Sequence, residues 1–156
     1  MASQKVGGKA PAFSGETQDG GKISLKDFAG KPLVLFFYPK DNTPGCTVES
    51  CDFRDRHDAL LTAGAAVVGV SPDPVKSHQK FAEKFGLPYP LLADVEKKTS
   101  EAYGVWVEKS LYGRKYMGIA RTTFLIDPAG KIARIWEKVK PEGHASEVLA
   151  ALKDLS

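Results

Sequence analysis

The sequence predicts an α/β fold in which helices flank a mixed central β-sheet. Residues 33–38 (LVLFFY) and 65–71 (AAVVGVS) are apolar at nearly every position, which is typical of strands covered on both faces. Each run precedes a segment with helical patterning, and alternation of strands and helices favours parallel pairing. Residues 122–139 (TTFLIDPAGKIARIWEKV) have the pattern of a hairpin, which adds antiparallel strands. A chain of 156 residues is long enough for one well-cored domain and too short for two, so we expect a single domain, 1–156.

The first part of the chain predicts a short strand, a buried strand and a helix. Residues 20–32 (GGKISLKDFAGKP) contain the short strand, with glycine and proline turns on both sides. The buried strand follows at once and ends before Pro39. Residues 47–62 predict the helix, which ends before Gly64. Its apolar residues available for burial are Val48, Phe53, Leu60 and Leu61.

The second apolar run also leads into a predicted helix. We expect Asp73 to cap this helix, with Pro74 at its first position, because short polar side chains and proline favour those two places. The helix has one apolar stripe, and Gly86 is expected to end it. The stripe consists of Phe81, Ala82 and Phe85.

The last part of the chain completes the sheet. Residues 89–94 (YPLLAD) predict a short strand, and Asp94 is expected to cap a helix that reaches about Tyr103. Residues 104–120 are of mixed polarity and predict a loop with at most one strand. After the hairpin, residues 144–155 (HASEVLAALKDL) predict an amphipathic closing helix. This order allows a thioredoxin-like fold without demanding one.

Charge and hydropathy exclude several classes of protein. The 22 basic and 19 acidic residues leave a net charge of +3, which does not indicate nucleic-acid binding. Residues 1–13 (MASQKVGGKAPAF) contain no apolar core of a secretory signal. No run approaches the roughly 20 apolar residues of a membrane helix, so we expect a cytoplasmic protein without membrane contact. In that reducing compartment two close cysteines are more often reactive or metal-binding than permanently bridged.

The two cysteines of the chain, Cys46 and Cys51, lie where a strand gives way to a helix. The thiolate is the reactive form of cysteine, and the unpaired N–H groups and dipole at a helix N-terminus favour that anion. Thr43 lies three residues before Cys46 on the same side. Its hydroxyl can accept from a backbone N–H or can bind the sulfur or the group that the sulfur attacks.

The spacing of the two cysteines restricts how they can pair. Helix residues five apart are separated by roughly 8.6 Å between Cα atoms, whereas a disulfide needs no more than about 7 Å. Either the pair never forms a bond, or the helix unwinds when it does. Two buried structural thiols remain an alternative. A metal site is weakly supported because the histidines (His57, His78 and His144) lack ligand spacing with the cysteines, and the Cys-x-x-Cys of dithiol–disulfide oxidoreductases is absent.

Residues 38–51 (YPKDNTPGCTVESC) resemble the active-site segment of peroxiredoxins. That family shares Pro-x-x-x-Thr-x-x-Cys, which Pro39, Thr43 and Cys46 match. A second cysteine five residues later resembles the peroxiredoxin Q group, also called bacterioferritin comigratory proteins. The resemblance covers nearly the whole chain in the expected order. It includes residues 10–39, 67–73 (VVGVSPD) and 121–132 (RTTFLIDPAGKI).

The resemblance implies a thioredoxin-like fold and a role for each matching residue. Cys46 would be the peroxidatic nucleophile, and Cys51 would resolve its sulfenic acid as an intramolecular disulfide. Arg121 would bind both the thiolate and the peroxide. Thr43 would position the peroxide. Two further residues would support them: Pro39 would shield the thiolate from water and Glu49 would orient the arginine.

The resemblance also implies substrates and partners. The substrates would be hydrogen peroxide and alkyl hydroperoxides, and a thioredoxin-type or glutaredoxin-type dithiol would reduce the disulfide. The enzyme would be a monomer without a cofactor or a metal. Two rival hypotheses are a disulfide oxidoreductase on the same fold, and a redox sensor or holdase that uses the disulfide as a switch.

Overall fold

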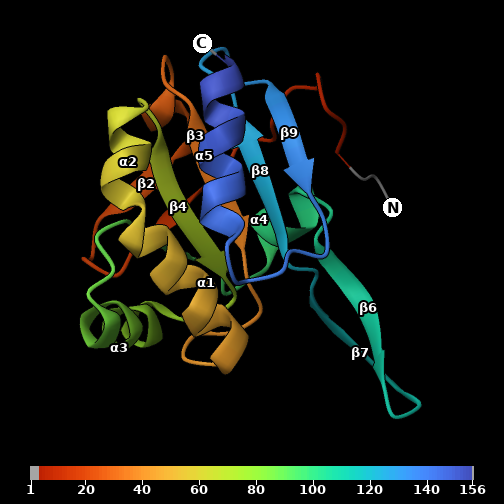
Figure 1. Ribbon diagram of the computed structural model, residues 1–156. Coiled ribbons are helices and arrows are strands. Elements are labelled where there is room, and N and C mark those ends of the chain that lie inside the picture. The colour runs from red at the N-terminus through yellow and green to blue at the C-terminus, as the bar shows by residue number, and fades with distance from the viewer. Residues whose placement is uncertain (1–3, 156) are drawn as a thin grey trace.

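A computed structural model describes residues 4–155. Its centre is a five-stranded mixed sheet with helices in front of it and behind it (Figure 1). The middle strand pairs in parallel with one neighbour and antiparallel with the other, as expected for a βα unit joined to a closing hairpin. In spatial order the strands are β5 (Leu91–Ala93), β4 (Ala66–Ser71), β3 (Leu33–Phe37), β8 (Thr122–Ile126) and β9 (Ile132–Trp136).

The all-apolar sequence of β3 places it at the centre of the sheet. All five of its side chains are buried. Val34 and Phe36 belong to one core cluster, and Leu33, Leu35 and Phe37 belong to the other, because successive strand residues point to opposite faces. The predicted strand covered on both faces is confirmed.

Helices cover the face of the sheet that carries Val34 and Phe36. The cluster on this face includes Phe53 of α1, Phe81 of α3 and Val148 of α5. The other face is covered by the N-terminal segment and the residues around α4. The helices are α1 (Pro44–Asp55), α2 (His57–Thr62), α3 (Val75–Phe85), α4 (Lys98–Ala102) and α5 (His144–Leu155).

The helix predicted at 47–62 is wrong in its start and in its continuity. It begins at Pro44, where a proline is tolerated because first-turn N–H groups need no helical partner, and it breaks at Arg56 into α1 and α2. Val48 and Leu61 are 46% and 51% exposed instead of buried. The buried stripe of α1 follows the i, i+3, i+4, i+7 pattern through partly polar residues: Cys46, Glu49, Ser50 and Phe53.

The predicted cap of α3 is also wrong by one residue. Pro74 occupies the N-cap position, and the Asp73 carboxylate accepts hydrogen bonds from the Asp41 backbone N–H and from the Ser71 hydroxyl instead. Gly86 ends α3 with φ of 60°, as predicted.

Lys97 and not Asp94 is the N-cap residue of α4, so the predicted cap is wrong in position, but Asp94 still satisfies the N-terminus of this helix. Its carboxylate accepts from the backbone N–H groups of Thr99 and Ser100. The helix is shorter than expected and ends at Ala102, one residue before Tyr103.

The segment predicted as a loop at 104–120 is a second hairpin. Its strands, β6 (Trp106–Leu111) and β7 (Arg114–Ile119), pair antiparallel and project from the body of the protein (Figure 1). Most of their side chains are exposed or half-buried, so the sequence lacks the apolar alternation of a half-buried strand.

The remaining elements match the sequence. The strand expected within residues 20–32 is β2 (Lys22–Ser24), which pairs with β1 (Ser14–Glu16) and leads into the short 3-10 helix η1 (Leu25–Phe28). The closing hairpin and the closing helix are confirmed as β8–β9 and α5. Within residues 4–155, no helix combines the length and the apolar character needed to span a bilayer.

Candidate active site

The candidate site lies where β3 leads into α1. Residues 38–43 form the connecting loop, and Cys46 is the third residue of the helix, with 1% of its surface exposed. Thr43 is the N-cap residue in extended conformation, and its hydroxyl donates to the Lys40 carbonyl at 2.8 Å. That bond uses the only hydroxyl hydrogen of Thr43, so its oxygen is left as an acceptor for another donor.

Sheet pairing brings Arg121 to the cysteine. The β3–β8 register sets Phe37 opposite Thr122, so the residue before Thr122 lies beside the chain that enters α1. The Nη2 of Arg121 donates to Cys46 Sγ at 3.3 Å. The guanidinium places a positive charge and a hydrogen-bond donor at the sulfur. A segment 75 residues away in sequence thus completes the environment of the sulfur.

The absence of a side chain at Gly45 makes room for the guanidinium. Gly45 lies directly under it: a Cβ atom at this position would be 3.2 Å from Arg121 Nη2 and 3.6 Å from Pro141 Cγ. Pro141 therefore lies beside the first turn of α1, and the predicted site residue Pro39 is half-buried in the loop before the helix. The sequence offered no signal for Pro141.

Glu49 holds the other arm of the arginine. Its Oε1 accepts from Arg121 Nη1 at 2.6 Å, and the Glu49 side chain is completely buried. Burial raises the pKa of this carboxyl group to about 7, although the charge of Arg121 acts in the opposite direction. Its second oxygen, Oε2, has no hydrogen-bond partner among the described residues. The geometry agrees with the predicted orienting contact between Glu49 and Arg121.

Cys51 lies on the same helix and is half-buried, and both cysteines are free thiols. Because α1 is helical from Pro44 to Asp55, the Cα atoms of the pair are separated by roughly the 8.6 Å of a regular helix. Burial raises the pKa of the Cys51 thiol. The two sulfurs cannot reach bonding distance while this helix is intact.

Within the part of the chain that the structure describes, three hydrogen bonds attach the second half of α1 to the rest of the protein. The Ser50 carbonyl accepts from the Tyr89 hydroxyl at 2.6 Å, and the Asp52 carboxylate accepts from the Ala145 N–H at 2.8 Å. Arg54 donates to the Phe85 carbonyl at 2.7 Å. The first half of α1 is held by the contacts of Arg121. Unwinding that starts at the N-terminus of α1 therefore breaks the Arg121 contacts and then meets the Ser50 attachment.

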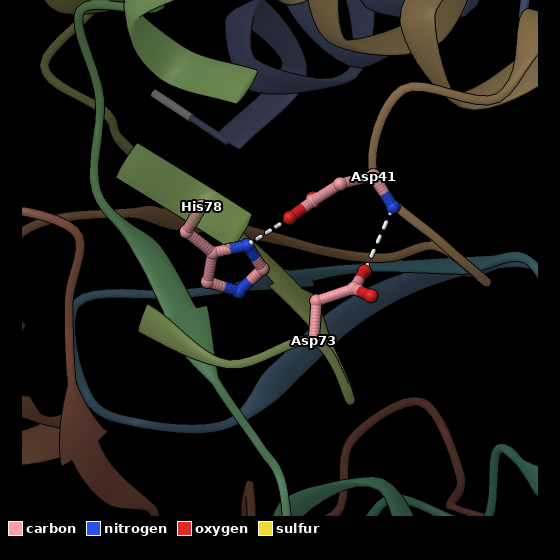
Figure 2. Close-up of side chains that lie close together, drawn as sticks. All are labelled: Asp41, Asp73 and His78. Atoms are coloured by element: carbon pink, nitrogen blue, oxygen red, sulfur yellow. Dashed lines mark hydrogen bonds and ion pairs between the residues drawn. The ribbon is translucent and has the colours of Figure 1, made fainter. Parts of the chain in front are cut away.

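One group of buried polar residues near the loop was not predicted. Asp41 accepts hydrogen bonds from the Tyr38 hydroxyl at 2.6 Å and the Ser77 hydroxyl at 2.8 Å, and its carboxylate lies 2.7 Å from His78 Nδ1 (Figure 2). The hydroxyl of Tyr38, the last residue of the apolar run 33–38, is thus hydrogen-bonded. The ligand atoms of Asp41, Asp73 and His78 lie within 4.8 Å of one another. Since both Asp41 oxygens already accept hydrogen bonds, the group is a hydrogen-bonded network.

Comparisons with known proteins agree with the motif in the sequence. A model of the AhpC/TSA family matches residues 6–135. Peroxiredoxin Bcp of Bacillus subtilis is 49% identical over 152 residues, which is 97% of each chain. Peroxiredoxin Bcp of Escherichia coli is 45% identical over 154 residues, which is 99% of each chain.

The solved structures that match this chain include proteins of the same group. Bacterioferritin comigratory protein of Xanthomonas campestris, described with alkyl peroxide reduction activity, matches at 43% identity with a TM-score of 0.88, over 92% of this chain and 91% of that one. PrxQ of Xylella fastidiosa matches at 36% identity with a TM-score of 0.90, over 99% of each chain. The thioredoxin-like fold that these peroxiredoxins share agrees with the predicted fold class.

Proposed function

Because the chain belongs to the AhpC/TSA family, and within it to the peroxiredoxins named Bcp or Q, we propose that it is a thiol peroxidase that acts through Cys46. The substrates are hydrogen peroxide and organic hydroperoxides. The observation that carries this proposal is the 3.3 Å contact between the Arg121 guanidinium and the sulfur of Cys46 at a helix N-terminus.

The first step oxidises Cys46. Its thiolate attacks the nearer peroxide oxygen, the O–O bond breaks, and the leaving oxygen takes up a proton to become water or an alcohol. Arg121 stabilises the negative charge that develops on the departing oxygen. Thr43 accepts a hydrogen bond from the peroxide O–H, because its own hydrogen is directed to the Lys40 carbonyl. Pro39 keeps water from the thiolate.

The second step forms a disulfide. Cys51, as a thiolate, attacks the sulfur of the Cys46 sulfenic acid, and the hydroxyl group leaves as water after it takes up the proton of the former Cys51 thiol. The reaction requires that α1 unwind around residues 44–51, since the intact helix keeps the sulfurs apart. A dithiol of the thioredoxin or glutaredoxin type then supplies two electrons and two protons and restores both thiols. The protein works in the cytoplasm as a single-domain monomer without cofactor or metal.

A coupled assay with thioredoxin, thioredoxin reductase, NADPH and peroxide tests this function. We expect continuous NADPH oxidation that depends on peroxide, no turnover for Cys46→Ser, and one oxidation without efficient recycling for Cys51→Ser. Full turnover by Cys46→Ser would refute the assignment. A single equivalent of peroxide consumed without further turnover, with thioredoxin or with glutaredoxin, would favour the redox sensor.

A further inference from the structure

The loop that carries Thr43 is held from the neighbouring β4–α3 unit rather than from α1. Asn42 adopts a φ of 57°, a left-handed conformation that is uncommon for residues other than glycine. Asp41, just before it, is buried and binds side chains of α3 through its carboxylate. The buried contacts of Asp41 therefore anchor the loop next to the left-handed residue, and Lys84 of α3 adds an exposed hydrogen bond to Asn42.

The peptide group between Lys40 and Asp41 is held at both ends. Its N–H, on Asp41, donates to Asp73 Oδ2 at 2.7 Å (Figure 2). Its carbonyl, on Lys40, accepts from the Thr43 hydroxyl at 2.8 Å. Because a peptide group is planar, fixing the direction of the N–H also fixes the direction of the carbonyl.

The two hydrogen bonds form a continuous chain from Asp73 to Thr43. The Asp73 carboxylate polarises the N–H, the peptide transmits this polarisation to its carbonyl, and the carbonyl draws the hydrogen of Thr43. The Thr43 oxygen then becomes a better acceptor with a fixed direction. Ser71 supports this arrangement, since its hydroxyl donates to the same Asp73 oxygen at 2.7 Å.

The side chain of Asp41, the residue that carries the N–H of this peptide, is anchored as well. His78 Nε2 lies 3.0 Å from the Leu92 carbonyl, which only accepts, so Nε2 carries a hydrogen. His78 Nδ1 lies 2.7 Å from Asp41 Oδ2, and the two side chains are 0% and 3% exposed. Tyr38 and Ser77 complete the partners of this carboxylate. A buried pair of this kind does not tolerate loss of one partner, so the loop has little freedom to shift.

We propose that Asp41 and Asp73 are positioning residues: they hold the peptide whose carbonyl takes the Thr43 hydroxyl hydrogen, so that the Thr43 oxygen is left to accept from the peroxide. This inference rests on the proposed peroxidase function and concerns its first step. Neither carboxylate touches the peroxide or Cys46. Their effect reaches the substrate only through Thr43, and this dependence separates positioning from a general role in folding.

A double-mutant cycle measures that dependence. The second-order rate constant for oxidation of Cys46 by hydrogen peroxide is determined in a Cys51→Ser background, which leaves one thiol. Asp73→Ala should lower this rate constant about tenfold, because small misplacements of a positioning group cost that much or more. Asp73→Asn should recover most of the loss, since the amide oxygen can still accept from the Asp41 N–H. In a Thr43→Val background, Asp73→Ala should change the rate less than about twofold.

Two controls distinguish positioning from damage to the fold. Asp94 is a matched control, because it is also buried, also follows a strand and also accepts from backbone N–H groups, but within residues 4–155 its side chain makes no hydrogen bond to the loop. Asp94→Ala should lower the melting temperature and leave the peroxide rate constant unchanged. Alkylation of Cys46 by iodoacetamide should be the same in Asp73→Ala as in the parent, since it does not require Thr43.

The outcomes distinguish this inference from the function on which it rests. A parent protein that does not react with peroxide overturns both. A reactive parent with an unchanged Asp73→Ala rate overturns only the positioning role. So does an equal loss from Asp73→Ala in the presence and in the absence of the Thr43 hydroxyl.

Discussion

Replacing Tyr89 by phenylalanine should accelerate disulfide formation. The Tyr89 hydroxyl donates to the Ser50 carbonyl at 2.6 Å, and this bond has to break when residues 44–51 unwind. The ring of Tyr89 is buried and packs edge-on against Phe36, and a phenylalanine keeps that packing. The substitution therefore removes one attachment of α1 and little else.

The size of the effect follows from the energy of one hydrogen bond. A buried bond between neutral groups contributes about 1 kcal/mol net to the folded form. The unwound form lacks this bond in either protein, so Tyr89→Phe destabilises only the intact helix. A change of about 1 kcal/mol in the unwinding equilibrium corresponds to a rate increase of about fivefold.

Rapid mixing with one equivalent of peroxide, followed by acid quenching and mass spectrometry, measures the rate of disulfide formation. Tyr103→Phe is the matched control, because the Tyr103 hydroxyl donates to the Pro11 carbonyl at 2.7 Å, far along the chain from α1. Both variants should lose similar thermal stability, but only Tyr89→Phe should form the disulfide faster. An unchanged or slower rate in Tyr89→Phe would refute the idea that unwinding past Ser50 limits this step.

Three further predictions concern the surroundings of the sulfur. Gly45→Ala should leave the thermal stability unchanged or raise it, because alanine favours a helix. The same substitution should lower the peroxide rate constant by up to about tenfold, because a Cβ 3.2 Å from Arg121 Nη2 displaces the guanidinium. Calorimetry and stopped-flow oxidation measure the two effects, and a parallel loss of both would contradict this. Arg121→Lys keeps the charge but cannot bond to Cys46 and Glu49 at the same time through two guanidinium nitrogens. The peroxide rate constant should therefore fall about a hundredfold or more. A loss under threefold would contradict the role of the arginine. Burial raises the pKa of Glu49 from 4.5 to about 7, so the native protein binds more protons than the unfolded chain between these pH values. The contribution of Glu49 to the free energy of unfolding should therefore fall by about 3 kcal/mol as the pH rises from 4.5 to 7. Urea denaturation of Glu49→Gln should lack this fall, and identical pH profiles of the two proteins would rule it out.

The sequence predicts the buried elements of the fold well. β3 and β4 are continuous apolar runs, the β8–β9 hairpin has a turn sequence between two such runs, and α5 has a clear apolar stripe. The β6–β7 hairpin could not be predicted in this way, since its strands pack against little and carry no alternating pattern. The early start of α1 at Pro44 was missed because the buried stripe of this helix includes Glu49 and Ser50, which are polar.

Some residues of the candidate site could likewise be predicted from the sequence, and others only from the structure. A local motif identifies Thr43 and Cys46, because both lie on one short segment. The contact between Cys46 and Arg121 depends on sheet pairing, and only the resemblance to a family linked the two in the sequence. The bond between Asp41 and His78 spans 37 residues and follows no motif, so the network behind the loop could be found only in the structure.

Cys46 lies beside Arg121 as a free cysteine, and we expect it to form a disulfide with Cys51 only when α1 unwinds. Mass spectrometry after one equivalent of hydrogen peroxide, with free thiols alkylated, tests it most directly. We expect both thiols to escape alkylation in a single chain and a peptide pair linked through residues 46 and 51. Recovery of both alkylated cysteines, or oxidation confined to Cys51, would contradict the account.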